Sequence, residues 1–218
     1  MPRPVLFVLA GVNGAGKSSI GGHALLAAGL DWFNPDAFAR ELIAATGCDA
    51  QTANAEAWSE GMRRLDRALA SNRSHAFETT LGGRTVASKL LAAARTHNLH
   101  VMYFGLASPE QHIARVRARV AAGGHDIPEA LTRARFESAQ LNLLRLMPVL
   151  TRLQIYDNSA EADEDGVIPD PVLVLDYHDG RIRHPDPNDA SSLKSTPHWA
   201  RAIVEAALSR SAAVVDAS

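Results

Sequence analysis

The segment that most constrains this chain is a glycine-rich run directly after an apolar stretch. Residues 5–10 are apolar and fit a buried strand, and residues 11–18 then read Gly-Val-Asn-Gly-Ala-Gly-Lys-Ser. This is the G-x-x-x-x-G-K-S pattern in the strand-to-helix context of a phosphate-binding P-loop. Glycines let backbone N–H groups converge on phosphate oxygens, Lys17 reaches the β and γ phosphates, and the Ser18 hydroxyl is a ligand for Mg²⁺. The sequence therefore predicts binding of a nucleoside triphosphate with magnesium. The expected nucleotide contacts are Gly11, Asn13, Gly14, Ala15, Gly16, Lys17, Ser18 and Ser19.

Length, charge and cysteine content narrow the class of protein. The 218 residues predict one domain, 1–218, that buries a core without disulfides. With 22 basic and 24 acidic residues, the chain has no general attraction for nucleic acid or an acidic membrane. The single cysteine, Cys48, excludes an internal disulfide and suits a reducing compartment. The first apolar run is too short to span a membrane and leads into the P-loop, so we expect a cytoplasmic protein.

Alternating strand and helix patterns predict a P-loop NTPase or kinase fold of the α/β class. The expectation is a mainly parallel five-stranded sheet flanked by helices, with a helical lid at about 108–147 and a C-terminal hairpin and helix at about 171–210. The expected strands are 5–10, 30–33, 75–79, 99–106 and 152–156, and the hairpin strands are 172–176 and 181–184. The expected helices are 19–28, 37–46, 51–71, 85–97, 108–122, a segment starting at 126–129 and stopped by Pro148, and 199–208. Residues 159–170 are expected to form an exposed acidic loop.

One set of apolar residues at helical spacing predicts which side of a helix is buried. Trp58, Met62, Leu65 and Leu69 recur at helical spacing within 51–71, so we expect all four to face the core.

Three motifs that the sequence lacks narrow the possible functions of a P-loop protein. The chain lacks the Asn-Lys-x-Asp sequence of a guanine reader. Leu81-Gly82-Gly83-Arg84 lies too close to the P-loop to be the signature of an ABC ATPase, and no apolar strand ending in Asp-Glu follows it. No further motif of a nucleic-acid motor is evident. Small-molecule phosphotransfer is the function class that the remaining features favour.

A kinase needs a base for the acceptor hydroxyl and groups that hold the acceptor. Asp36 follows the second expected strand at the carboxyl edge of the sheet, where open α/β folds bind ligands. Its alternative role is to stabilise the helix dipole from the first turn. Glu78, Thr79 and Thr80 end the third expected strand at the same edge and either hold a polar acceptor or cap the strand.

Arginines crowd the segment around the expected lid turn. Glycines at 123–124 allow a lid to close, and the planar guanidinium suits phosphate clamping. Some of these arginines are expected to be merely solvated, and His125 in the turn either contacts phosphate or stabilises the turn. The arginines are Arg115, Arg117, Arg119, Arg133 and Arg135.

Together these segments resemble the zeta toxin family of P-loop kinases and its chromosomal bacterial relatives. The matching segments are 11–19, Asn34-Pro35-Asp36, Glu78-Thr79-Thr80-Leu81, Arg119-Val120, 123–129 and Tyr156-Asp157-Asn158-Ser159. The resemblance implies ATP-dependent phosphorylation of a sugar hydroxyl on a nucleotide sugar such as UDP-N-acetylglucosamine, and a protein antitoxin as a partner.

The resemblance also implies residue roles. Asp36 matches the general base, Glu78 and Thr80 match residues that hold the acceptor, and Lys17 and Ser18 keep their phosphate and Mg²⁺ roles. Arg119 matches one charge-stabilising arginine, and the other is either Arg133 or Arg135. Two alternatives stay open: a P-loop kinase for another small alcohol, such as an antibiotic, sugar or nucleoside, and a noncatalytic ATP-gated binding protein.

Overall fold

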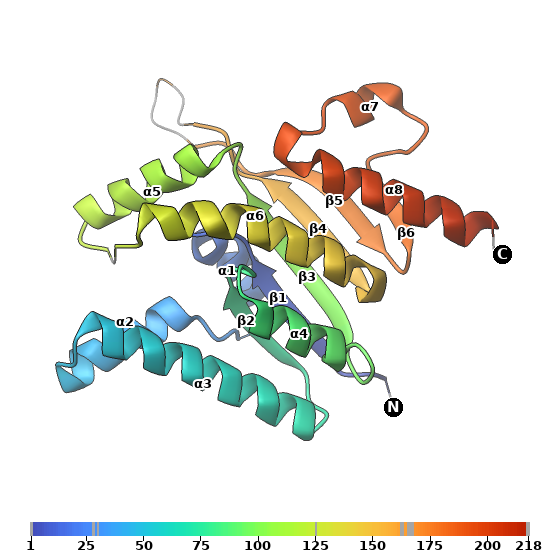
Figure 1. The fold of residues 1–218 in the computed structure, drawn as a ribbon. Coiled ribbons are helices and arrows are strands. Elements are labelled where there is room, and N and C mark those ends of the chain that lie inside the picture. The colour runs from blue at the N-terminus through green and yellow to red at the C-terminus, as the bar shows by residue number, and fades with distance from the viewer. Residues whose placement is uncertain are drawn as a thin grey trace.

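The strand before the glycine run, β1 (Val5–Ala10), lies inside the sheet and not at its edge (Figure 1). A computed structural model describes residues 2–27, 29, 31–124, 126–161, 164 and 168–216. These residues form a six-stranded sheet in the order β2-β1-β3-β4-β5-β6. The other strands are β2 (His75–Thr79), β3 (Asn98–Gly105), β4 (Arg152–Asp157), β5 (Val172–His178) and β6 (Arg181–His184).

Strand direction brings several chain segments to one edge of the sheet. β2, β1, β3 and β4 run parallel, whereas β5 and β6 pair antiparallel and extend the same sheet. Ala10 at the end of β1 pairs with Thr79 on one side and Tyr103 on the other. The P-loop, the end of β2 and the end of β4 therefore meet at the carboxyl edge, where open α/β folds bind ligands.

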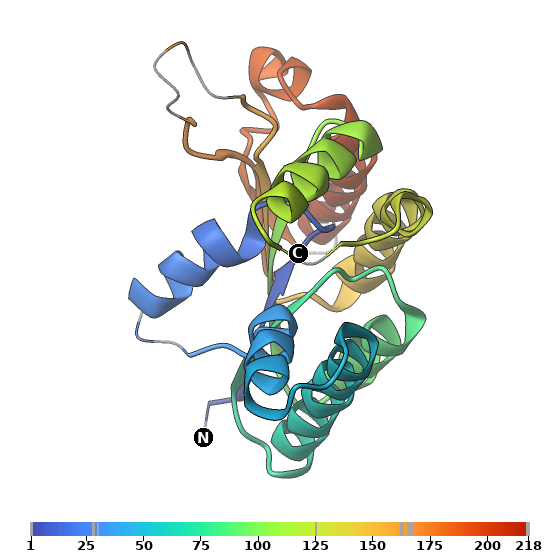
Figure 2. The same ribbon diagram turned by 90° about the vertical axis from the view of Figure 1, so that its left-hand side faces the viewer.

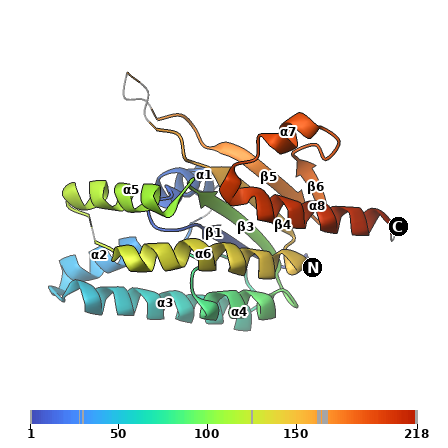
Figure 3. The same cartoon turned by 45° about the horizontal axis from the view of Figure 1, so that its top comes forward.

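Helices cover both faces of the sheet. Figure 2 shows α1 on one face and α4, α6 and α8 on the other. Alternate strand residues serve the two layers: Leu9 and Phe104 pack toward α1, while Val8 and Tyr103 belong to the larger cluster beneath α4, α6 and α8. The α2 and α3 pair lies at the β2 end of the molecule and α8 at the β6 end (Figure 3). The helical elements are η1 (Lys17–Gly21), α1 (Gly22–Ala27), α2 (Pro35–Thr46), α3 (Ala50–Ala70), α4 (Arg84–Ala93), α5 (Pro109–Ala121), α6 (Glu129–Leu146), η2 (Met147–Val149), α7 (Ala190–Lys194), η3 (His198–Ala200) and α8 (Arg201–Asp216).

Local sequence signals account for the helix and hairpin ends. Asn34 caps α2, because its Oδ1 accepts the N–H of Ala37 at 3.0 Å, and Ser108 caps α5 in the same way. Asp179 and Gly180 have φ of 48° and 79°, which is the left-handed turn that joins β5 to β6. Among the described residues, no helix is long and apolar enough to cross a membrane.

The fold class predicted from the sequence is confirmed, and two details are corrected. The expected strand 30–33 reduces to one bridge between Phe33 and Phe77, so the parallel part of the sheet has four strands within the described residues and the hairpin makes six. The reason is local: Pro35 has no N–H for a ladder and already begins α2. Leu30, His125, Asp163 and Asp165 lie outside the described residues.

The second correction concerns Trp58, which is 54% exposed and does not face the core. The buried stripe of α3 runs instead through small residues and one leucine: Ala53, Ala57, Gly61, Leu65 and Ala68. Small side chains let α2 approach α3 closely, as the cluster of Ala39, Ala53 and Ala57 shows. This rotation of α3 turns Trp58 away from the core; Met62 and Leu69 stay partly buried against it.

Candidate active site

The P-loop backbone adopts angles that only glycine takes without strain. Gly11, Gly14 and Gly16 have φ of 141°, 83° and 85°. A Cβ at Gly11 would lie 2.2 Å from the carbonyl oxygen of Phe104, and one at Gly16 would lie 2.6 Å from Nδ2 of Asn158. The loop is therefore folded tightly against the ends of β3 and β4.

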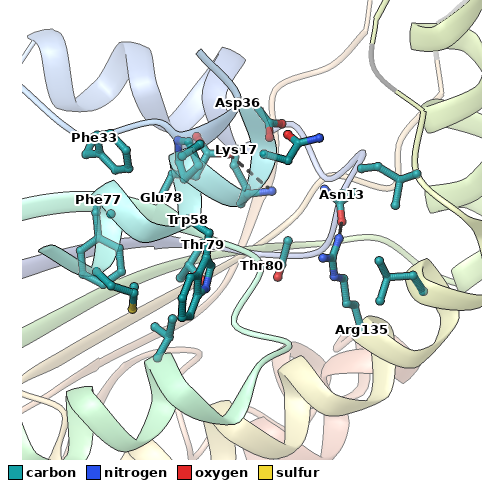
Figure 4. A pocket seen from close by; sticks show the side chains of 18 of the residues that line it. Asn13, Lys17, Phe33, Asp36, Trp58, Phe77, Glu78, Thr79, Thr80 and Arg135 are labelled. Atoms are coloured by element: carbon teal, nitrogen blue, oxygen red, sulfur yellow. Dashed lines mark hydrogen bonds and ion pairs between the residues drawn. The ribbon is translucent and has the colours of Figure 1, made fainter. Parts of the chain in front are cut away.

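The functional side chains of the P-loop meet Glu78 at the end of β2. Lys17 Nζ lies 3.6 Å from Glu78 Oε1, and both side chains are only 7% exposed (Figure 4). The Ser18 hydroxyl donates to the same carboxylate, with Oγ 2.8 Å from Oε2 and 3.0 Å from Oε1. Asn34 Nδ2 donates to Glu78 Oε2 at 3.1 Å. The contacts of Glu78 are thus with the phosphate-binding loop and the start of α2.

This arrangement suits Mg²⁺. A hydroxyl and a carboxylate are the hard oxygen ligands that Mg²⁺ takes in phosphotransfer sites, where phosphates and water complete the shell. Within the described part of the chain, no group of three or more His, Cys, Asp or Glu side chains could hold a metal by itself. Ser18 and Glu78 fit an ion that is held mainly by a bound nucleotide.

A pocket of about 360 Å³ opens beside this cluster. Figure 4 shows Lys17, Glu78, Thr80 and Arg135 around it, contributed by the P-loop, by β2 and the residues after it, and by α6. Asp36, from the first turn of α2, lines the same pocket. The fold thus brings together five residues from four separate segments of the sequence.

Asp36 faces an arginine of α5. Arg119 Nη1 lies 3.8 Å from Asp36 Oδ2, and the two side chains are 39% and 46% exposed. The carboxylate is accessible from the pocket, as a group that accepts a proton must be.

The two α6 arginines occupy different surroundings. Arg135 lines the pocket and donates from Nη1 to Oδ1 of Asn13 at 2.7 Å. Burial lowers the pKa of Arg135, and Asp36 opposes this effect. Arg133 is exposed and pairs with Glu110 of α5, outside the residues that line the pocket. Of the two, only Arg135 lines the pocket beside the P-loop.

The absence of a side chain at Gly82 leaves space for the side chain of Arg135. A Cβ at Gly82 would lie 2.8 Å from Arg135 Cγ. The Leu81-Gly82-Gly83-Arg84 segment therefore gives α6 room beside the pocket.

The first half of α5 holds the other side of the P-loop. His112, 1% exposed, bonds through Nδ1 to the carbonyl oxygen of Asn13 at 2.8 Å, so Nδ1 carries the proton. Burial lowers the pKa of His112 to about 4, which keeps the ring neutral at neutral pH. Asn158, after β4, donates from Nδ2 to the carbonyl oxygen of Ala15 at 3.0 Å.

The same half of α5 also donates hydrogen bonds to the loop that follows β4. Arg115 Nη2 donates to the carbonyl oxygens of Asn158 and Ala160 at 2.8 and 3.0 Å. Gln111 Nε2 donates to the carbonyl oxygen of Ser159 at 2.6 Å. The P-loop, α5 and residues 158–160 form one hydrogen-bonded unit.

Sequence reasoning missed two of these features. It placed Trp58 in the core, although the small-residue stripe one position away was a visible signal of the true buried face. It gave His112 no role, and no local pattern marks a histidine that reaches a loop 99 residues earlier.

A P-loop at the carboxyl edge of a mainly parallel sheet, with helices on both faces, defines a P-loop nucleotide-binding protein. Residues 6–145, more than half of the chain, match the family described as AAA domain, and the chain belongs to this family. A search of curated proteins finds no match.

Solved structures show the same fold. A chain in the crystal structure of AvrRxo1-ORF1:-ORF2 with ATP is 19% identical, with a TM-score of 0.63, over 90% of this chain and 64% of that chain. A chain of the PezAT chromosomal toxin-antitoxin system of Streptococcus pneumoniae is 14% identical, with a TM-score of 0.57, over 96% of this chain and 86% of that chain. This chain therefore spans less than two thirds of the length of the AvrRxo1 chain. The resemblance to toxin-type P-loop kinases is confirmed at the level of the fold.

Proposed function

We propose that this protein is an ATP-dependent kinase that transfers the γ-phosphoryl group of ATP to a hydroxyl of a small molecule. One observation carries the proposal: a phosphate-binding lysine, an accessible carboxylate and a lid-helix arginine line a single pocket. These residues are Lys17, Asp36 and Arg135. A phosphate site without chemistry needs no carboxylate at its acceptor side, whereas a kinase needs a group there that accepts the hydroxyl proton.

The donor half consists of residues 11–19. Their backbone N–H groups surround the phosphates, and Lys17 leaves Glu78 to bind the β and γ oxygens. Ser18 and Glu78 would hold Mg²⁺, which would neutralise phosphate charge. Glu78 thus serves the donor half in this proposal, while Thr80 remains beside the acceptor.

The transfer step is an in-line displacement. The acceptor oxygen forms a bond to the γ phosphorus while the bond from that phosphorus to the bridging oxygen of ADP breaks. Asp36 takes the proton of the acceptor hydroxyl. Arg119 and Arg135 stabilise the charge on the transferred group, because a guanidinium stays protonated and matches phosphate geometry.

Two classes of molecule are candidates for the acceptor. The sequence resemblance implies a nucleotide sugar such as UDP-N-acetylglucosamine, and its alternative is another small alcohol. A protein antitoxin as partner and a cytoplasmic location belong to the same proposal. The similarity to a toxin-antitoxin system supports the partner only through the shared fold.

The proposal is tested with Asp36→Asn, which keeps the shape of the side chain and removes its basicity. We expect ATP affinity to stay within about twofold and acceptor-stimulated ADP release to fall by about 10²-fold or more. Glu41→Gln, an exposed change on the same helix, is the matched control and keeps full turnover. Full activity of Asp36→Asn would exclude it as the base. ATP binding without ADP release for any acceptor would instead identify a noncatalytic ATP-gated binding protein.

A further inference from the structure

The basic side chains that line the pocket both lie beside the P-loop. Of the described residues that line it, only Lys17 and Arg135 are basic. Both contact the P-loop: Lys17 Nζ lies 3.4 Å from the carbonyl oxygen of Val12, and Arg135 bonds to Asn13. The proposed γ-phosphate site therefore uses both cations.

The lining residues that do not contact the P-loop are called the acceptor end here, and their charged members are carboxylates. Asp36 lines it from α2 and Asp126 lines it from the turn before α6. Arg119, the cation that faces Asp36, is 3.8 Å from that carboxylate. No lysine or arginine is found among the described lining residues that do not touch the P-loop.

Apolar side chains make up the wall of this acceptor end. Trp58, Met62, Phe77 and Leu131 line it. Trp58 is 54% exposed and Leu131 is 42% exposed, although both are large apolar residues. An indole that is exposed inside a concave pocket is a surface on which a flat ring packs.

We infer that the acceptor is an uncharged alcohol with a flat ring that packs against Trp58, and not a nucleotide sugar with a diphosphate. The inference rests on the proposed kinase function and names the substrate class of the same site. Two phosphate charges in the acceptor end would lie near Asp36 and Asp126, and the cation that faces Asp36, Arg119, is already assigned to the γ-phosphate in the proposed transfer. Proteins bind such groups with arginines, lysines or helix N-termini, because unpaired charges lose their hydration without compensation.

The test measures ADP release from the full chain with ATP and Mg²⁺ and three acceptor probes. Uridine and 2-phenylethanol are uncharged ring alcohols, and UDP-N-acetylglucosamine adds the diphosphate. We expect kcat/KM for at least one uncharged probe to exceed that for UDP-N-acetylglucosamine by about tenfold or more, which is the cost of one poorly compensated charge.

Variants of the wall separate ring packing from folding. Trp58→Ala raises KM for the uncharged probe by about tenfold, the loss expected for one aromatic stacking partner, with kcat and ATP affinity within about twofold. Trp58→Phe restores most of the affinity. Leu141→Ala, which removes an equally exposed apolar side chain of α6 outside the pocket, leaves KM unchanged.

A variant that adds a positive charge tests whether a diphosphate is disfavoured because the acceptor end lacks a cation for it. Leu131→Arg places a cation at the acceptor end and should raise kcat/KM for UDP-N-acetylglucosamine relative to uridine. Turnover of UDP-N-acetylglucosamine at a kcat/KM equal to or above that of the uncharged probes would overturn the inference and leave the kinase proposal standing. An unchanged KM in Trp58→Ala would also overturn it. Absence of ADP release with every probe would overturn the kinase proposal and the inference together.

Discussion

Glu78 is the buried charge whose loss the structure allows us to quantify. Its carboxylate lies 3.6 Å from Lys17 Nζ, and each side chain is 7% exposed. At that separation two unit charges attract by about 4.6 kcal/mol at an effective dielectric constant of about 20. Glu78→Gln keeps one oxygen that can accept the hydrogen bonds of Ser18 and Asn34, so it removes mainly the charge.

We expect Glu78→Gln to lower the free energy of unfolding by about 3 kcal/mol without nucleotide. Breaking a buried pair costs about 3–5 kcal/mol, because the remaining charge stays buried without a partner. The lower end applies here, since Lys17 can still approach the carbonyl oxygen of Val12. For a chain of this length the loss corresponds to a fall in Tm of about 6–12 °C.

Urea unfolding followed by circular dichroism measures this loss, with Asp66→Asn as the matched control. Asp66 pairs with Lys89 on the surface, with side chains 54% and 30% exposed, so its loss should cost at most about 1 kcal/mol. In about 1 M salt the Debye length is about 3 Å, so the control effect should vanish while the Glu78 effect persists. A Glu78→Gln loss below about 1 kcal/mol, or one that salt removes, would refute this reasoning.

Two further predictions concern packing and pH. A Cβ at Gly105 would lie 2.3 Å from the Trp199 ring, so Gly105→Ala should displace the indole and lower the free energy of unfolding by about 1–3 kcal/mol, measured by urea unfolding. Because burial lowers the pKa of His112 to about 4, the unfolded chain binds more protons between about pH 4 and 6.5, and stability falls as the pH drops through that window. His112→Gln keeps a donor for Asn13 and should flatten this pH dependence; an unchanged slope would contradict it.

Local chemistry was sufficient to predict much of the fold. The P-loop and the C-terminal hairpin each depend on a few neighbouring residues, and both occur where the sequence predicts them. The strand expected at 30–33 is limited to one bridge at Phe33, because Pro35 begins α2 directly after Asn34. The rotation of α3 was missed because it depends on how closely α2 approaches, which is a tertiary property.

The sequence selected residues that the fold brings to one pocket, but it did not indicate which of them contact one another. Asp36, Glu78 and Thr80 do line one pocket with the P-loop lysine. The sequence could not reveal that Glu78 contacts Ser18 and Lys17, because strand order alone decides which loop the end of β2 faces. Nor could it separate Arg133 from Arg135, since two positions along a helix point the side chains to different partners.

The N-terminal half of α5 is anchored by hydrogen bonds. Gln111, His112 and Arg115 bind carbonyl oxygens of the P-loop and of residues 158–160, so the N-terminal half cannot move without breaking four hydrogen bonds. If the proposed lid closes over ATP, a hinge after Arg115, toward Gly123, whose φ is 87°, would leave these bonds intact. Closure would move α6 and the end of α5 while the nucleotide-binding frame keeps its shape, so substrate entry and ATP retention can be tuned by different parts of one helix.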